Sequence, residues 1–109
     1  MNAPCLPPFA GCAFEVAYEG LTAINAYAAD SLILRYEITE GALRGARGEV
    51  HYRWREIIPD IYAISWQEAD GATVVHIDDF ALGTSQSFLT TRELDLYRLS
   101  GALRPLGGS

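Results

Sequence analysis

Two side chains that could exchange protons with a bound molecule lie two residues apart in an apolar part of the sequence. His76 and Asp78 fall within residues 72–79, a short apolar run between turn residues that predicts a β-strand. Residues two apart in a strand point to the same side, with their backbones about 7 Å apart. At that spacing the carboxylate can orient and charge-stabilise the imidazole, so we take His76 and Asp78 as the candidate catalytic acid–base pair.

The sequence leaves open the direction in which this pair points, because both faces of the segment are apolar. One face adds Val74 and Phe80 to the pair, and the other carries Val75 and Ile77. If His76 faces the interior, it either makes a structural hydrogen bond or contacts a ligand. If it faces outward, both polar side chains are solvated.

A second charged pair, Arg35 and Glu37, shares one face of residues 31–38. Simple alternation points these charges outward and places Leu34 and Tyr36 inward. An inward pair would have to be satisfied by each other, by a tyrosine or by a ligand carboxylate, because an isolated buried charge is very costly. We keep Arg35, Tyr36 and Glu37 as candidate ligand-binding residues.

Aromatic side chains are more abundant than the packing of so small a domain requires, with six Tyr, four Phe and two Trp. Rings with one polar tip are a usual lining for a flat organic ligand. We expect most of them in the core and select Tyr18 and Trp66 as further walls of a cavity. The sequence thus favours a barrel that binds a small hydrophobic or aromatic ligand. The alternative is a cofactor-free enzyme of the lyase, isomerase or decarboxylase type.

Metal and cofactor motifs are not found in the sequence. The cysteines and histidines, Cys5, Cys12, His51 and His76, show no C-x-x-C or H-x-x-x-H spacing. No glycine-rich phosphate loop follows a predicted strand, and there is no Gly-x-Ser-x-Gly elbow. We therefore expect no metal, no cofactor and no covalent catalysis.

The elements that must position these residues are all strands. Short apolar or alternating runs separated by turn residues predict eight of them, at 12–18, 21–28, 31–38, 49–57, 61–67, 72–79, 84–90 and 94–103. Eight sequential strands form an up-and-down antiparallel meander, which removes its open edges by closing into a barrel. Such a barrel is filled by side chains or holds one small ligand. We expect a Pro-rich arm (1–11) across one mouth, a single barrel domain (12–104) and a flexible tail (105–109).

Three stretches of the sequence resemble the MoaF-like family of small calycin barrels, which is related in fold to the lipocalins and the phenolic acid decarboxylases. They are Arg35-Tyr36-Glu37-Ile38-Thr39-Glu40-Gly41 leading to Gly45, Ile61-Tyr62-Ala63-Ile64-Ser65-Trp66-Gln67-Glu68 with Asp70-Gly71, and Val75-His76-Ile77-Asp78-Asp79-Phe80 with Gly83. The resemblance implies a calycin-like, lipocalin-like barrel, and it implies no settled chemistry.

The decarboxylase resemblance extends to one site residue, Tyr18, ahead of the first hairpin. Where such decarboxylases carry a second tyrosine, an arginine and a glutamate, this chain has Val16, Glu37 and Pro59. Arg35 and Asp60 lie two residues and one residue from the matching positions. A shifted version of the decarboxylase site is therefore an alternative arrangement.

Charge and hydropathy limit the partners of the chain. Eight Lys+Arg against fourteen Asp+Glu give a net charge of −6 and a pI near 4.7, which disfavours nucleic acid and anionic membranes. No apolar run is long enough to span a membrane, and residues 1–11 do not read as a signal peptide. We expect a cytoplasmic protein with reduced thiols. Residues 31–38 and 72–80 are apolar on both faces, which predicts a homodimer.

Overall fold

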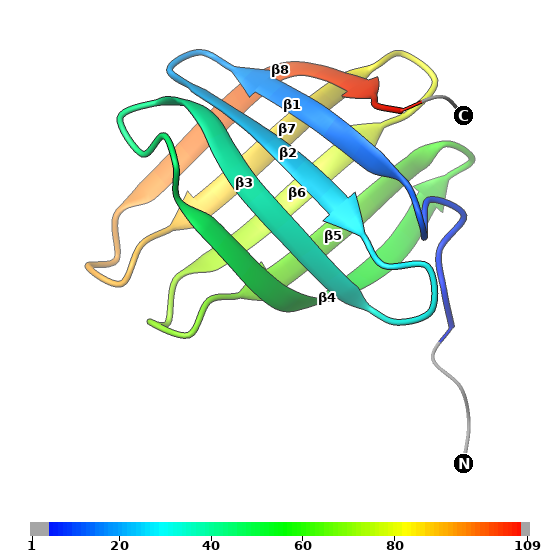
Figure 1. The fold of residues 1–109 in the computed structure, drawn as a ribbon, viewed down its shortest axis with the longest axis horizontal. Helices are drawn as coiled ribbons and strands as arrows, with labels where there is room; N and C mark the ends of the chain where they lie inside the picture. Colours follow the sequence, from blue (N-terminus) through cyan, green and yellow to red (C-terminus); the bar gives the residue numbers. More distant parts are fainter. Residues whose placement is uncertain (1–4, 108–109) are drawn as a thin grey trace.

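The chain forms a single closed antiparallel barrel in which each strand pairs with its neighbours in sequence and the last pairs with the first (Figure 1). The computed structural model describes residues 5–107. The eight strands are β1 (Ala13–Tyr18), β2 (Leu21–Tyr27), β3 (Ile33–Gly41), β4 (Arg47–Ile58), β5 (Ile61–Gln67), β6 (Thr73–Asp79), β7 (Thr84–Thr90) and β8 (Leu96–Pro105). The prediction of an all-β, up-and-down, eight-stranded barrel is confirmed. None of the residues in this range belongs to a helix capable of crossing a membrane.

The strand limits follow the prediction most closely where turns are short. β5 and β7 have the predicted bounds, whereas β3 and β4 extend further toward their shared loop, to Gly41 and from Arg47. Polar residues after Ile38 suggested a longer loop, but β3 continues to pair with β2 as far as Gly41 opposite Leu21, and β4 already pairs with β3 at Arg47 opposite Glu37. The charged residues of these extensions tolerate a ladder position because Glu40, Arg47 and Glu49 are exposed.

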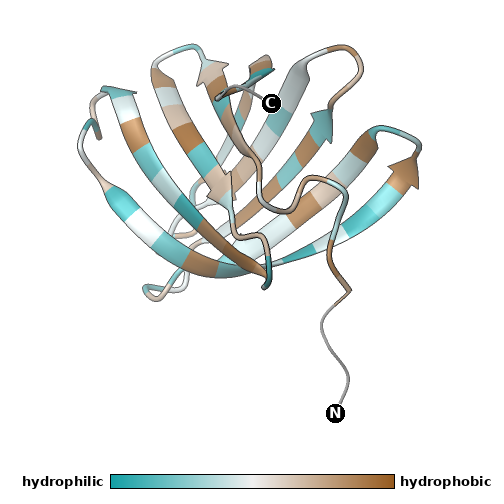
Figure 2. Ribbon diagram, turned by 45° about the vertical axis from the view of Figure 1, so that its right-hand side comes forward, coloured by the Kyte–Doolittle hydropathy of each residue, from teal (hydrophilic) through white to brown (hydrophobic). Residues whose placement is uncertain are grey.

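Burial alternates along the strands, as expected for a barrel with one wet face. The pattern is clearest in β1, where Phe14, Val16 and Tyr18 are buried. Figure 2 shows the resulting bands of apolar and polar residues along the ribbons. Where β8 closes on β1, a Cβ at Gly101 would lie 2.0 Å from the carbonyl oxygen of Ala17, so this close strand approach requires glycine.

One end of the barrel, which we call the closed end, is filled by aromatic side chains. Residues 5–11 lie at this end (Figure 1), and their Phe9 is 4% exposed. The rings around Phe9 belong to Tyr27, Tyr62 and Phe80, with centroids at 4.7, 5.4 and 5.3 Å. The Trp54 indole also donates a hydrogen bond of 2.9 Å to the carbonyl of Cys5. The rest of the predicted arm and tail, residues 1–4 and 108–109, lies outside the described residues.

Candidate functional site

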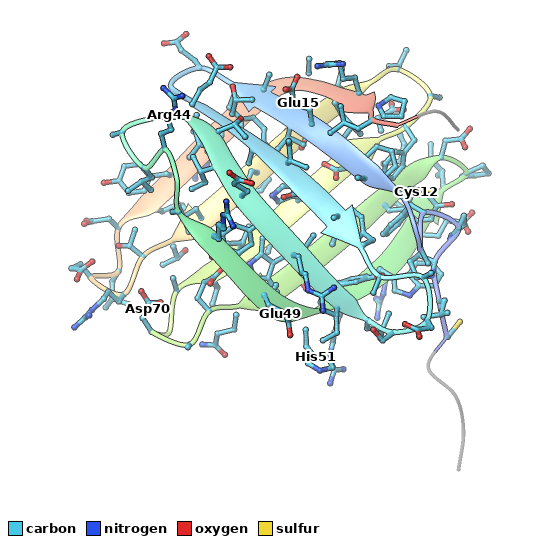
Figure 3. The ribbon with its side chains drawn as sticks, in the orientation of Figure 1. Cys12, Glu15, Arg44, Glu49, His51 and Asp70 are labelled. Atoms are coloured by element: carbon cyan, nitrogen blue, oxygen red, sulfur yellow. The ribbon has the colours of Figure 1, made fainter. Side chains whose placement is uncertain are left out.

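The opposite half of the barrel contains a cavity of about 460 Å³, within the size range of small-molecule sites. It runs from the barrel centre to exposed loop residues at what we call the open end. Figure 3 places Asp70 at this end and Cys12 at the closed end. The lining is mainly apolar and comprises Val16, Tyr18, Leu21, Ala23, Asn25, Tyr36, Ile38, Leu43, Trp66, Glu68, Ala69, Asp70, Val74, His76, Ser87, Leu89 and Leu99.

The structure turns His76 and Asp78 into the barrel, with exposed fractions of 4% and 1%. His76 lines the cavity, and Asp78 lies deeper, toward the closed end. The Nδ1 atom of His76 is 3.6 Å from Oδ1 of Asp78, which is too long for a hydrogen bond. The expected direct orientation of the imidazole by the carboxylate is therefore not formed.

A chain of hydroxyl groups connects the two residues instead. The Ser85 hydroxyl donates to Asp78 Oδ1 at 2.5 Å, and Tyr18 Oη lies 2.7 Å from Ser85 Oγ. Because the single hydroxyl hydrogen of Ser85 goes to Asp78, the Tyr18 hydroxyl must donate to Ser85. Tyr18 Oη can then accept a long, weak hydrogen bond from His76 Nδ1, 3.5 Å away. We call His76, Tyr18, Ser85 and Asp78 the hydroxyl relay.

Burial keeps the tyrosine of this relay in its neutral form. It raises the pKa of Tyr18 well above its usual range, and the nearby charge of Asp78 adds to the effect. Donation from His76 Nδ1 leaves Nε2 of the same ring as a hydrogen-bond acceptor. The relay thus connects a residue that lines the cavity to a buried carboxylate.

Two more tyrosine hydroxyls, on rings near Phe9, are buried inside the barrel. Tyr27 and Tyr52 have ring centroids 5.1 Å apart, and neither hydroxyl has a hydrogen-bond partner within residues 5–107. Burial raises the pKa of both phenols, and for Tyr27 the charge of Asp78 contributes as well. The described residues therefore offer these two hydroxyls no protein hydrogen bond to offset the cost of their desolvation.

At the open end, Glu68 is held between two aromatic side chains. Trp66 Nε1 donates to Oε2 at 2.7 Å, and the Tyr36 hydroxyl donates to Oε1 at 2.9 Å. The Tyr36 ring passes over Gly48, where a Cβ would lie 2.4 Å from the ring. Burial, followed by the hydrogen bond to Glu68, raises the pKa of Tyr36 to about 12. We call Trp66, Tyr36 and Glu68 the rim triad.

Glu68 was not among the site residues expected from the sequence. It follows the end of β5 and begins the turn that leads to β6, a position typical of solvated hairpin residues. The sequence feature that could have revealed Glu68 is its spacing from Trp66. The two residues are two apart, so in an extended chain their side chains point to the same side. Tyr18, Tyr36 and Trp66, by contrast, line the cavity, and their role as ligand-binding residues stays a prediction.

The structure does not bring Arg35 and Glu37 to the cavity, which corrects their selection as ligand-binding residues. Arg35 Nε lies 2.8 Å from Glu49 Oε1, and Glu37 is 3.7 Å from Arg47, in pairs on the outer face. The two-residue period of the strand sends both side chains outward because Tyr36 between them points inward. Figure 3 shows Glu49 and His51 on the outside.

A shifted decarboxylase site is also not assembled. It would need Arg35 and Asp60 near Tyr18, but Arg35 is on the outer face. Asp60 occupies the turn between β4 and β5, at the closed end, with a φ of 74°. Turn geometry explains this position, since aspartate tolerates the left-handed region better than most residues.

Comparison with known proteins places the chain among small barrels of its own size. A family model described as MoaF-like matches residues 10–104. The chain is 58% identical to a Burkholderia vietnamiensis protein whose crystal structure is described as that of "a putative beta-lactamase", and the two structures superpose with a TM-score of 0.92. That match covers 94% of this chain and 100% of the other. No curated protein matches the chain.

Proposed function

We propose that the barrel of this chain, which belongs to the MoaF-like family, binds one small hydrophobic or aromatic molecule. The observation that carries this proposal is the cavity of about 460 Å³ with mainly apolar walls. An eight-stranded barrel can be filled entirely by its own side chains. The closed end of this barrel is filled in that way by Phe9 and its neighbours.

Small side chains keep the other half of the barrel open. Ala23, Asn25 and Ser87 point into it at positions where larger residues would fill the space. Aromatic walls at Tyr36 and Trp66 offer flat surfaces to a ring, and their polar atoms are already satisfied by Glu68. These features support a ligand with a largely apolar body.

An enzyme that uses acid–base chemistry is the second candidate, favoured by the hydroxyl relay. His76 lines the cavity and is connected through Tyr18 and Ser85 to a buried carboxylate. A histidine so placed can accept a proton from a bound molecule or return one. The geometry fits a lyase or isomerase that needs no cofactor.

The name of the Burkholderia vietnamiensis protein suggests a different activity. Serine β-lactamases use a Ser-x-x-Lys motif, whereas this sequence contains no lysine. Metal-dependent ones need clustered ligands, and within residues 5–107 no group of three or more His, Cys, Asp or Glu is placed to hold a metal ion. We therefore infer function from the cavity and not from that name.

A cytoplasmic location is also part of the proposal. The free thiols Cys5 and Cys12 support it, because proteins of oxidising compartments tend to pair their cysteines.

A thermal-shift screen of small aromatic and hydrophobic molecules tests the binding proposal. Ala23→Phe places a ring in the cavity and should abolish stabilisation by any hit, whereas Ala102→Phe on the exposed side of β8 should preserve it. Hits that stabilise both variants equally would show that they bind elsewhere and would contradict the proposal. Mass analysis of the recovered ligand separates the two candidates, since a binder returns it unchanged and an enzyme alters it.

A further inference from the structure

The charged groups around the cavity are almost all acidic. Glu68 and Asp70 line it, and Asp78 lies just beneath its floor. All eight basic residues counted in the sequence are arginines, and every one of them is exposed and absent from the cavity wall. His76 is the one lining residue within 5–107 that can acquire a positive charge. A ligand carboxylate, sulfonate or phosphate would therefore face negative groups with no arginine to bind it.

The rim triad has the chemistry of a site for an organic cation. Rings of tryptophan and tyrosine attract ammonium groups over their faces. Here both rings line the cavity, and each holds one oxygen of the same carboxylate. The hydrogen bonds fix Glu68 beside the rings while its negative charge remains uncompensated by any described cation.

The floor of the cavity adds a second group suited to such a ligand. His76 is 4% exposed, its ring centroid is 5.1 Å from that of Trp66, and its Nδ1 faces the hydroxyl relay. The remaining nitrogen, Nε2, makes no side-chain hydrogen bond with the described residues. As an acceptor it matches a donor group such as N–H.

We propose that the ligand is an organic cation, an apolar or aromatic body bearing an ammonium group that lies against Trp66 and Tyr36 with Glu68 as its counter-charge. This inference rests on the proposed function, because it assigns a ligand class to the same cavity. It also separates the chain from barrels that act on carboxylate ligands, which need a cationic side chain in the cavity.

Three probes of closely similar shape test the sign of the charge. Benzyltrimethylammonium, neopentylbenzene and phenylmethanesulfonate share a benzyl group and a tetrahedral head that is cationic, neutral or anionic. Titration followed by tryptophan fluorescence and by calorimetry should show binding of the cation and none of the sulfonate. A sulfonate that binds as tightly as the cation overturns the inference. If the neutral probe alone binds, the cavity function stands and the cation inference falls; if none binds, both fall.

A charge-neutral variant tests the role of Glu68. Glu68→Gln keeps the side-chain shape and should weaken binding of the cation by about tenfold, the scale of one charge-assisted contact, without changing the affinity for neopentylbenzene. Glu49→Gln removes the same charge from the outer face, where Glu49 pairs with Arg35, and should leave both affinities unchanged. Equal weakening of both probes by Glu68→Gln would show that Glu68 only shapes the rim. The wild-type comparison of the three probes still decides the matter if that variant fails to fold.

Discussion

Ser85 Oγ lies 2.7 Å from the hydroxyl oxygen of Tyr18 and simultaneously donates to Asp78. This one hydroxyl therefore satisfies two buried groups on different strands, β1 and β6. Ser85 itself has no exposed surface. Its removal cannot be compensated by bulk water, because the site lies inside the barrel.

Replacing Ser85 by alanine should therefore be unusually costly for so small a change. Ser85→Ala leaves the Asp78 carboxylate and the Tyr18 hydroxyl without their shared partner, and we expect a loss of about 2–3 kcal/mol in the free energy of unfolding. Denaturant unfolding measures it. Ser100→Ala, at an exposed position on β8, is the matched control and should change stability little. Similar values for the two variants would contradict the hydroxyl relay.

Tyr52 and Tyr18 should respond in opposite ways to loss of their hydroxyl groups. Tyr52→Phe removes a buried group that has no partner among the described residues, so stability should be unchanged or rise by up to about 1 kcal/mol. Tyr18→Phe removes a group bonded to Ser85 and should destabilise by about 1–2 kcal/mol. Thermal unfolding of the two variants side by side checks the contrast, and a loss of stability in Tyr52→Phe would refute it.

Alkaline pH should weaken the fold through tyrosine ionisation. In the folded state the pKa of Tyr36 is raised to about 12 from the usual 10.0. Above pH 10 the unfolded chain releases this proton while the folded chain retains it, so stability present below pH 10 is lost as the pH rises toward about 12. Tyr36→Phe should reduce this loss, and the variant's ultraviolet titration should lack one phenol that ionises near pH 12. If the phenol lost in the variant is instead one that ionises near pH 10, the role given to Glu68 is contradicted.

Crowding at Gly48 provides an independent test of the rim triad. Gly48→Ala places a Cβ 2.4 Å from the Tyr36 ring, which must move away from Glu68. We expect destabilisation of about 1–3 kcal/mol and weaker binding of cavity ligands. Adding Tyr36→Leu to Gly48→Ala should relieve the clash and recover stability without recovering affinity. Full stability in the single variant would show that the ring is not confined there.

The predicted homodimer is tested by sedimentation equilibrium. Val75 remains 36% exposed on the outer face of β6 and is paired with Phe88 of β7. A second copy that covers this surface would give a mass twice 11.9 kDa, and Val75→Glu should shift the protein to monomer without unfolding it. A monomeric parent protein at micromolar concentration would rule out the dimer.

The sequence was sufficient to predict the barrel because the fold is encoded locally. Turn residues between short alternating runs indicate each hairpin. Because an open sheet leaves two unpaired edge strands, the eight strands are expected to close into a barrel. The outward direction of Arg35 and Glu37 also followed from alternation with Tyr36. Keeping Arg35 and Glu37 as ligand-binding candidates against that alternation was therefore wrong.

Other parts of the site depend on contacts that a sequence pattern does not encode. Both faces of β6 are apolar, so the inward direction of His76 emerges only when the barrel closes around it. Ser85 joins the hydroxyl relay because β7 pairs with β6 and places it beside Asp78. Glu68 was missed because turn residues are ordinarily solvated, and its two aromatic donors come from different strands.

The aromatic filling around Phe9 has a consequence for the kinetics of binding. With one end of the barrel occupied by packed rings, a molecule in the cavity must leave by the path on which it arrived. A molecule that enters or leaves the cavity passes the exposed Leu43 and the turn at Asp70. For the ligand that we propose, we therefore expect these two loops to control the residence time, and exit by the other end would require the unpacking of Phe9.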